Sequence, residues 1–322
     1  MRRHPARRVN VPLRPGQTVG RYTMTRPLAA GGFGMVYEAS VGSTSDRVAV
    51  KEFLPAFLPC RTSSHTPRVA PRPADAASFD AGLRAFYEES DRLAKVSHPN
   101  VIQVLDIVSE HGTAYLVMPL ERGGTLQPLM TQRRRPSDRQ LIGWVAAAAE
   151  GAGALHAHGL LHLDIKPSNL WLRPDGRILV LDLGASRWRQ DIGDTAARVR
   201  TPGYAAPEQY GRARARLTTA TDVYALGATL WALAEGTTPP ESNARINRDM
   251  AWRYARLGQR SARMMAIVDR AMDLDPTARW PTPDRLRAAL LSVPDAGDRP
   301  PQPHECLPSS APRPPIEHRQ HS

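Results

Sequence analysis

Two of the few lysines of this chain stand where they could take part in chemistry. Lys51, Lys95 and Lys166 are the only three, and every other member of the 43 cationic side chains is an arginine. Lysine offers a compact ammonium group, whereas arginine offers a planar fork. Because the chain otherwise uses arginine, the lysines at positions 51 and 166 suggest a reaction that needs a compact positive charge.

Lys51 ends a strand pattern that follows a glycine-rich turn. Residues 28–37 hold three glycines between two strand patterns, and the backbone N–H groups of such a turn can approach phosphate oxygens. Alternation along residues 48–51 places Ala49 and Lys51 on one face, beneath the turn. Taken alone, a glycine cluster fits a plain hairpin equally well, and a lysine at a strand end is usually a surface residue.

Lys166 belongs to the most specific motif of the chain. Residues 162–169 contain His162, Asp164, Lys166 and Asn169 at four fixed offsets. A chance match of this kind in a chain of this size has a probability on the order of 10⁻³. An ordinary surface loop is therefore a poor explanation of the motif.

Two kinds of structure must position these motifs. Strand patterns interrupted by one helical pattern predict a small sheet with one helix in the first part of the chain. The strand patterns cover residues 22–28, 35–39, 47–52, 101–107 and 114–118, and the helical pattern covers residues 81–96. From residue 125 onward the periodicity is mostly helical, which predicts a mostly α second part. Its helical patterns cover residues 139–158, 220–234, 261–272 and 284–291, with short strands at 170–172 and 178–181.

Composition divides the chain into four parts. Residues 1–17 carry five arginines and no acid, and residues 294–322 are rich in proline with few apolar residues. Neither stretch can offset the entropy cost of ordering, so we expect a basic disordered tail and a Pro-rich disordered tail. Residues 18–118 and 119–293 form the two folded parts. The Pro-punctuated residues 54–74 predict a long loop within the first of them.

The ordered motifs resemble those of the protein kinase family, and in particular the bacterial eukaryotic-like serine/threonine protein kinases. At least six motifs occur in the family's order across residues 18–293, and the loop after residues 51–55 resembles a bacterial subgroup. The resemblance implies an α+β, two-lobed protein-kinase-like fold, with a small antiparallel β-sheet plus one helix in the N-lobe and a mostly α C-lobe. It also implies ATP and Mg²⁺ as cofactors, and transfer of the γ-phosphoryl group to a protein Ser or Thr hydroxyl.

Four residues are the catalytic candidates that this resemblance implies. Asp164 would be the base that accepts or orients the proton of the substrate hydroxyl, and Lys166 would neutralise charge on the moving phosphoryl group. Lys51 would hold the α- and β-phosphates and pair with a glutamate of the first helix. Glu89 fits that glutamate better than Glu88, because counting back from the turn after the helix places Glu89 in the family's register.

A nucleotide site and a metal site are also implied by the resemblance. In the hinge, Met118 would be the gatekeeper, the Pro119 carbonyl would accept from adenine and the Glu121 N–H would donate to it. Asn169 and Asp182 would be the Mg²⁺ ligands. The full set of implied nucleotide-binding residues is Leu28, Gly31, Gly32, Gly34, Val36, Ala49, Lys51, Met118, Pro119 and Glu121.

Further residues are implied to hold the second lobe together around the catalytic loop. Thr201 would bond to that loop, Glu208 would pair with Arg279, and Asp222 would bind the loop backbone. Leu163 stands where the family commonly has an arginine that grips a phosphorylated activation loop. We therefore expect activity that does not depend strictly on phosphorylation of the activation loop.

Three other classes of function stay open at this point. A pseudokinase or scaffold would share the fold, and loss of Lys51, Asp164, Asn169 or Asp182 would favour it, but all four are present. A small-molecule kinase would lack residues 201–208, the segment that cradles a protein substrate. The net charge of +12 could suit nucleic acid, but no nucleic-acid-binding motif accompanies it.

The remaining features bear on partners and location. Cys60 and Cys306 stand far apart in Pro-rich stretches, so no disulfide framework or metal cluster is predicted. The basic N-terminus lacks an apolar h-region, and the apolar-rich residues 141–163 contain ionisable side chains, which argues against a secretory signal and a membrane span. We expect a cytoplasmic enzyme with a protein substrate and no nucleic-acid partner, and the sequence is compatible with a homodimer.

Overall fold

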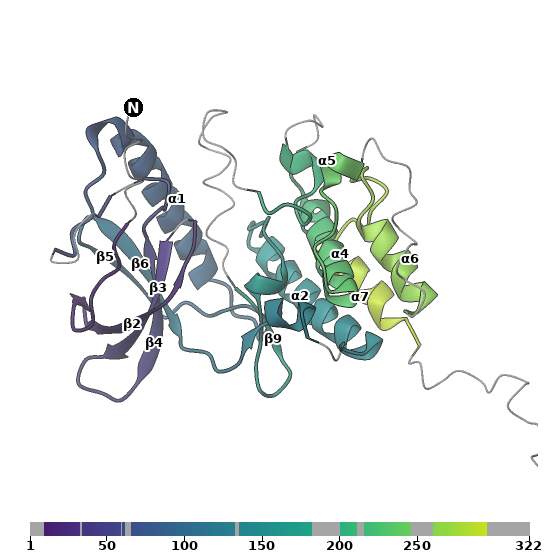
Figure 1. Ribbon diagram of the computed structural model, residues 1–322, viewed down its shortest axis with the longest axis horizontal. Coiled ribbons are helices and arrows are strands. Elements are labelled where there is room, and N and C mark those ends of the chain that lie inside the picture. The colour runs from purple at the N-terminus through teal and green to yellow at the C-terminus, as the bar shows by residue number, and fades with distance from the viewer. Residues whose placement is uncertain are drawn as a thin grey trace, which may run out of the picture.

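The chain folds into two lobes of different secondary structure in the computed structural model (Figure 1). The N-terminal lobe is rich in β-strands, and the C-terminal lobe is mostly helical. The two-lobed α+β expectation is thereby confirmed. The structure describes residues 10–32, 34–58, 60–61, 66–132, 135–181, 200–210, 216–245 and 260–294.

The N-lobe is built on a six-stranded antiparallel sheet with strand order β1-β2-β3-β4-β6-β5. Its strands are β1 (Thr18–Val19), β2 (Tyr22–Ala30), β3 (Gly34–Val41), β4 (Arg47–Phe53), β5 (Asp106–Glu110) and β6 (Thr113–Pro119). Helix α1 (Ala76–Ala94) lies beside the sheet, and Phe53 of β4 packs its ring against Phe79 and Phe86 of the helix. This aromatic contact fixes the helix to the strand that carries Lys51.

Two elements of the N-lobe differ from their predicted bounds. The strand expected at residues 101–107 begins at Asp106 and runs to Glu110, because residues 100–102 bond instead to strand β9 (Ile178–Val180) of the other lobe. Asn100 reinforces that link with a side-chain bond from Nδ2 to the Ile178 carbonyl at 2.8 Å. The predicted helix at residues 81–96 begins five residues earlier, after the short 3₁₀ helix η1 (Pro73–Asp75).

The predicted disordered tail at residues 1–17 is wrong for its second half. Residues 10–17 are attached to the N-lobe by hydrogen bonds, and two of them are buried, with Asn10 5% and Leu13 2% exposed. Leu13 is held by the apolar side chains of the sheet, and Asn10 by hydrogen bonds to the loop after β4. Part of that loop, which its prolines predicted, is buried: Leu54, Leu58, Cys60 and Arg61 are 7% exposed or less, and burial raises the pKa of the Cys60 thiol to about 11.

The C-lobe is mostly helical, as expected. Its elements are α2 (Asp138–Ala157), α4 (Thr219–Glu235), α5 (Ser242–Arg245), α6 (Ala262–Ala271) and α7 (Pro283–Leu291), with 3₁₀ helices η2 (Gln127–Met130), η3 (Pro167–Asn169) and η4 (Pro207–Tyr210). A small sheet has strand order β7-β8-β9, where β7 is Gly124–Thr125 and β8 is Leu170–Leu172. Ser137 begins α2 with a capping box to Gln140, which satisfies N–H groups that the first helical turn leaves unpaired.

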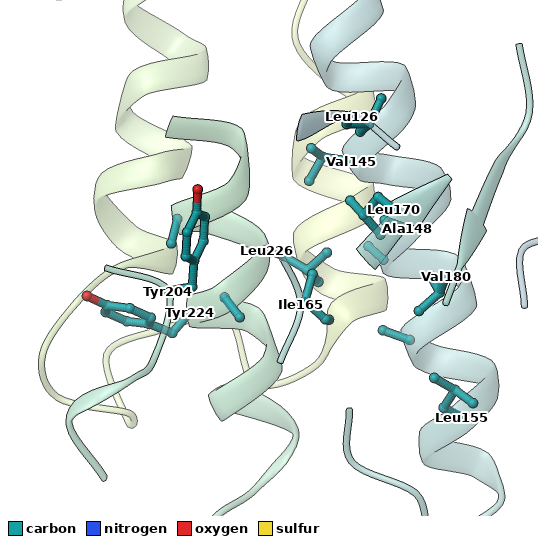
Figure 2. Packing of buried hydrophobic residues seen from close by; sticks show 14 of the residues in the cluster. Leu126, Val145, Ala148, Leu155, Ile165, Leu170, Val180, Tyr204, Tyr224 and Leu226 are labelled. Atoms are coloured by element: carbon teal, nitrogen blue, oxygen red, sulfur yellow. The ribbon is translucent and has the colours of Figure 1, made fainter. Parts of the chain in front are cut away.

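Helix α4 is the centre of the C-lobe. All residues from Ala220 to Ala234 are buried, so α4 is covered by protein on every side, as an apolar helix in a protein interior must be. Figure 2 shows Leu226 of α4 beside Ile165, which belongs to the loop between α2 and β8. The loop that carries Asp164 is therefore seated on the most buried helix. Within the described residues, no helix is long and apolar enough to cross a membrane.

Candidate active site

The loop between α2 and β8 carries Asp164 in a backbone conformation that needs outside support. Leu163 has φ of 60°, in the left-handed region that costs a branched side chain free energy. Asp222 of α4 accepts hydrogen bonds from the N–H groups of His162 at 2.8 Å and Leu163 at 2.7 Å. The expected contact between Asp222 and the loop backbone is confirmed, and it holds the residue before Asp164 in its strained form.

The Asp222 carboxylate is fully buried and ionised. Burial would raise the pKa of this carboxyl, but the hydrogen bond and charge of His156, with a further contribution from His162, lower it below the usual 3.8. His156 Nε2 lies 2.7 Å from Asp222 Oδ2. Because the folded pKa is depressed, the stability contributed by this group is present above pH 3.8 and is lost as pH falls through the folded value.

Replacing Asp222 by Asn should disturb catalysis more than nucleotide binding. Asparagine has one acceptor oxygen, so it cannot accept both loop N–H groups on two separate oxygens, and the loop would relax at Leu163. A displacement of about 1 Å at the reacting groups can cost roughly 10²-fold in rate. Steady-state kinetics should show kcat reduced by that order with the KM for ATP nearly unchanged. An unaltered kcat in a folded variant would show that the loop does not need this support.

Around the Asp164 carboxylate, three side chains converge. Thr201 Oγ1 donates to Asp164 Oδ1 at 2.6 Å, and Lys166 Nζ donates to Asp164 Oδ2 at 2.9 Å. Lys166 Nζ also donates to Thr201 Oγ1 at 2.9 Å, and Asn169 Nδ2 donates to the Asp164 backbone carbonyl at 2.8 Å. Asp164 itself is only 7% exposed. The structure thus brings together Asp164, Lys166 and Asn169, and it confirms the expected bond of Thr201 to this loop.

His162 connects the loop to the end of strand β9. Its Nδ1 accepts from the Asp164 N–H at 3.3 Å, which makes Nε2 the donor to the Leu181 carbonyl at 2.9 Å. The N–H of Leu181 in turn donates to the Asn169 carbonyl at 2.9 Å. Leu181, the chain neighbour of Asp182, is therefore bound at both of its backbone polar groups. Asp182 itself lies outside the described residues.

The described residues fit a magnesium nucleotide in their chemistry. The Asn169 amide points Nδ2 at Asp164, which leaves its oxygen as the atom that can face a cation. Among the described residues, no group of three or more His, Cys, Asp or Glu side chains is arranged so that it could hold a metal ion. Mg²⁺ commonly binds through one or two protein oxygens together with the phosphates of a substrate rather than in an all-protein cage.

In the N-lobe, the candidate nucleotide residues lie on neighbouring strands around the glycine-rich turn. Lys51 pairs with Val36 across β3 and β4, and Ala49 pairs with Met118 across β4 and β6. The turn is closed by a bond from the Gly31 N–H to the Gly34 carbonyl at 2.9 Å. A Cβ at residue 34 would overlap with the carbonyl oxygen of Glu52, so only glycine fits there. Lys51 and Glu89 are both buried, at 8% and 6% exposure.

The hinge is tied to the C-lobe by side chains that the sequence did not single out. Arg173 of the β8–β9 turn makes two hydrogen bonds to the Glu121 carboxylate, at 2.8 and 2.5 Å, and Trp171 Nε1 donates to the Arg122 carbonyl at 3.0 Å. Met118 and Pro119 end β6, where Pro119 pairs with Val48. The hinge backbone thus has a defined position. Leu28 of β2 is 37% exposed.

The expected pair of Glu208 and Arg279 is confirmed. Arg279 Nη1 and Nη2 donate to the two Glu208 oxygens at 2.7 and 2.9 Å, and both side chains are completely buried. Gln209, which sequence reasoning missed, donates from Nε2 to the Leu163 carbonyl at 2.9 Å and accepts from the Ala206 N–H at 2.9 Å. Its position directly after Glu208 was the only signal in the sequence.

Comparison with known proteins gives a consistent result. Residues 22–290 match the family described as protein kinase domain. The chain is 32% identical over 240 residues to the DNA damage-responsive serine/threonine-protein kinase RqkA of Deinococcus radiodurans, covering 71% of this chain and 32% of that protein. It is 30% identical to the serine/threonine-protein kinase PknA of Mycobacterium tuberculosis over 68% of this chain and 48% of that protein.

A solved structure agrees with these sequence matches. The structure titled PpkA-294 apo form is similar with a TM-score of 0.75 and 30% sequence identity, covering 87% of this chain and 99% of that one. The chain spans about a third to a half of the length of the two curated relatives, at 32% and 48%.

Proposed function

The chain belongs to the protein kinase family, and on that premise we propose that it is a serine/threonine protein kinase of the bacterial eukaryotic-like group, which transfers the γ-phosphoryl group of ATP to Ser or Thr hydroxyls of a protein. The observation that carries the proposal is the convergence of Lys166, Thr201 and Asn169 on the Asp164 carboxylate. We infer further that the enzyme acts in the cytoplasm, where the proposed donor ATP is available.

Each residue of the loop has a role that follows from its position. Among the described residues of the cluster, Asp164 is the one carboxylate, so it would accept the proton of the attacking hydroxyl at one of its oxygens. Lys166, already within hydrogen-bond distance of Asp164, would place its ammonium beside the charge that moves during transfer. Thr201 joins both, which keeps the base and the ammonium in register before substrate arrives.

The nucleotide would be held by residues of both lobes. We infer that Lys51 binds the α- and β-phosphates and pairs with Glu89, and that the backbone of Gly31, Gly32 and Gly34 covers the phosphates. The implied adenine contacts are the Pro119 carbonyl and the Glu121 N–H, beside Leu28, Val36, Ala49 and Met118. Mg²⁺ bound through Asn169 and Asp182 would neutralise charge on the phosphates.

Replacing Lys51 by Met should nearly abolish phosphoryl transfer. Incubation with [γ-³²P]ATP and Mg²⁺ should label the wild-type protein or an added protein substrate, and the variant should incorporate label about 10²- to 10³-fold more slowly, because a preorganised charge at the phosphates is lost. Lys95→Met is the matched control, since Lys95 lies on the surface in an ion pair with Asp91. Equal labelling of wild type and Lys51→Met would refute the proposal.

A further inference from the structure

The glycine-rich turn rests on the loop that follows β4. The Ala56 N–H donates to the Gly32 carbonyl at 2.9 Å, and the Glu52 carbonyl occupies the space where a side chain at Gly34 would lie. Glycines have no side chains with which to pack, so a turn made of them takes its position from what its backbone bonds to. The position of residues 52–56 therefore sets the position of this turn.

A single side chain from the N-terminal segment holds that loop. Asn10 Nδ2 donates to the carbonyls of Pro55 at 2.8 Å and Leu58 at 2.9 Å, and Asn10 Oδ1 accepts from the N–H groups of Cys60 at 2.7 Å and Arg61 at 3.0 Å. The amide thus uses both donors and both lone pairs in a site where it is 5% exposed. Two of its partners flank Ala56 in the chain.

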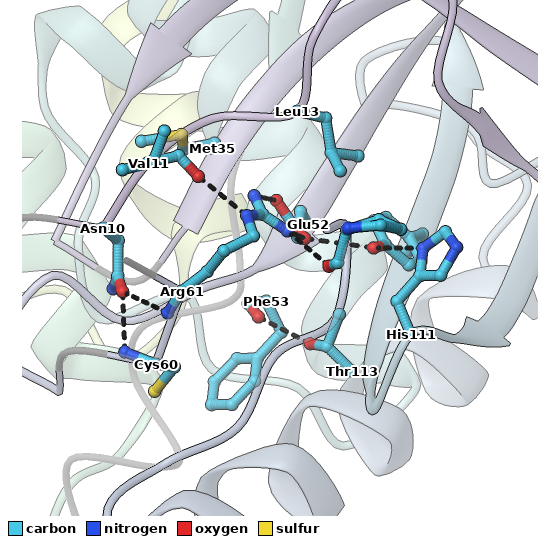
Figure 3. A network of polar contacts seen from close by, with 12 residues as sticks. Asn10, Val11, Leu13, Met35, Glu52, Phe53, Cys60, Arg61, His111 and Thr113 are labelled. Carbon is cyan, nitrogen blue, oxygen red and sulfur yellow. Dashed lines mark hydrogen bonds and ion pairs between the residues drawn. The ribbon is translucent and has the colours of Figure 1, made fainter. Parts of the chain in front are cut away.

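The segment around Asn10 is itself anchored on both sides. Val11 and Arg61 exchange two bonds, from the Val11 N–H to the Arg61 carbonyl at 2.9 Å and from Arg61 Nε to the Val11 carbonyl at 2.7 Å. The Leu13 N–H donates to the Tyr37 hydroxyl at 3.1 Å. We call residues 10–13 the N-terminal strap, which Figure 3 shows against the loop.

A buried ion pair continues this network into β4. The Arg61 guanidinium donates to both oxygens of Glu52 at 2.6 and 2.7 Å, with side-chain exposures of 1% and 0%. Tyr37 and Tyr115 also donate to the Glu52 carboxylate, at 2.7 and 3.0 Å. Glu52 is the neighbour of Lys51 in the strand, so the two side chains leave β4 on opposite faces. The network that includes the strap therefore lies on one face of β4, and the candidate nucleotide residue Lys51 lies on the other face.

We propose that Asn10 is a positioning residue of the nucleotide site, which acts through the Ala56 contact to hold the glycine-rich turn over the phosphates. The inference rests on the proposed function, because it assigns phosphate binding to that turn. Without the Asn10 amide, the Pro55 carbonyl keeps the Leu58 N–H as a donor and the Leu58 carbonyl keeps the Cys60 thiol, but both lose the bond that ties the loop to the strap. The loop then opens around Ala56. The Gly32 carbonyl then loses its fixed partner, and the turn samples more conformations before ATP binds.

The test uses Asn10→Leu, a variant of similar volume that removes all four bonds. In the nucleotide-free protein, hydrogen–deuterium exchange in peptides covering residues 30–35 and 54–58 should become about fivefold faster, the factor expected for loss of one hydrogen bond. The KM for ATP should rise by a similar factor, while the KM for the protein substrate stays unchanged. Asn10→Asp, which keeps the two acceptor bonds and loses the two donors, should change both quantities in the same direction and serves if Asn10→Leu does not fold.

A stability control separates positioning from general weakening of the lobe. Tyr22→Phe removes a partly buried hydrogen bond, which the Tyr22 hydroxyl donates to Asp106 Oδ2 at 2.8 Å. This bond lies in the same sheet but far from the glycine-rich turn. It should leave exchange at residues 30–35 and the KM for ATP as in wild type. If Asn10→Leu gives the same exchange and the same KM as Tyr22→Phe, the inference is wrong. If wild type incorporates no phosphate at all, the proposed function fails, and the exchange measurement still decides whether the strap orders the turn.

Discussion

Replacing Asp164 by Asn should lower kcat for phosphoryl transfer by about 10²- to 10⁴-fold, the range that a positioned general base contributes. The amide is close in shape to the carboxylate, so the loop should keep its fold, but it cannot accept the proton of the attacking hydroxyl. Lys166 and Asn169 would also face a neutral group in place of a charge. Because the change affects the reacting groups and leaves the N-lobe intact, the KM for ATP should change little.

Steady-state phosphorylation of a protein substrate, followed with labelled ATP, measures this effect. The matched control is Asp175→Asn, which makes the same chemical change at an exposed carboxylate in the β8–β9 turn, where Asp175 pairs with Arg177. Control and wild type should have the same kcat. If Asp164→Asn retains a kcat within a factor of about three of wild type, the loop does not supply the base.

Replacing Arg279 by Leu should destabilise the protein by about 3–5 kcal/mol, because the Glu208 carboxylate is left buried without its cationic partner, although Thr221 Oγ1 still donates to it at 2.9 Å. Arg279 is 1% and Glu208 4% exposed as whole residues, so water cannot replace the lost bonds. Arg279 Nε also donates to the Asp273 carbonyl at 2.7 Å, and that acceptor would be left unpaired too. This is the largest change of stability that we expect from a single substitution in the C-lobe.

Urea unfolding followed by circular dichroism gives the free energy of unfolding for each variant. Arg177→Leu is the control, since Arg177 and Asp175 form an ion pair at 2.6 Å with both side chains largely exposed, and such pairs contribute about 1 kcal/mol or less. The double variant Glu208→Leu with Arg279→Leu should regain part of the loss, because no charge is then left unpaired. A single variant as stable as Arg177→Leu would contradict this expectation, because it would show that the buried Glu208 carboxylate does not depend on Arg279.

The family of this protein could be predicted from short stretches of sequence. Residues 162–169 carry several functional side chains within eight positions, and the chain brings such neighbours together with little help from the rest of the fold. Helices α2 and α4 were predicted to within a residue or two of their ends, because apolar periodicity is a local signal.

Long-range contacts were predicted only where a motif implied them. Asp222 meets His162 across 60 residues, and Arg279 meets Glu208 across 71, and both contacts came from the family resemblance rather than from patterning. The strand at residues 106–110 was misplaced, because the apolar residues before it belong to a link with β9. Periodicity cannot distinguish pairing within one lobe from pairing with the other.

The strap shows what depends on tertiary structure. In the sequence, Asn10 follows an arginine-rich stretch and Arg61 lies in a loop rich in prolines. The sequence around both residues therefore has a composition typical of solvent-exposed, disordered chain. In the fold these two residues, 51 positions apart in the sequence, are hydrogen-bonded to each other and buried. Arg61 is buried because it neutralises the buried Glu52 carboxylate, and Asn10 because its amide bonds to polar backbone groups of the loop. Short motifs with fixed spacing indicated the kinase family, and periodicity predicted most of the elements. Only the tertiary structure decides which of the many arginines is buried and which amide supports the glycine-rich turn. The reason is that packing buries polar groups, such as the Glu52 carboxylate and the loop carbonyls, which must then find hydrogen-bond partners.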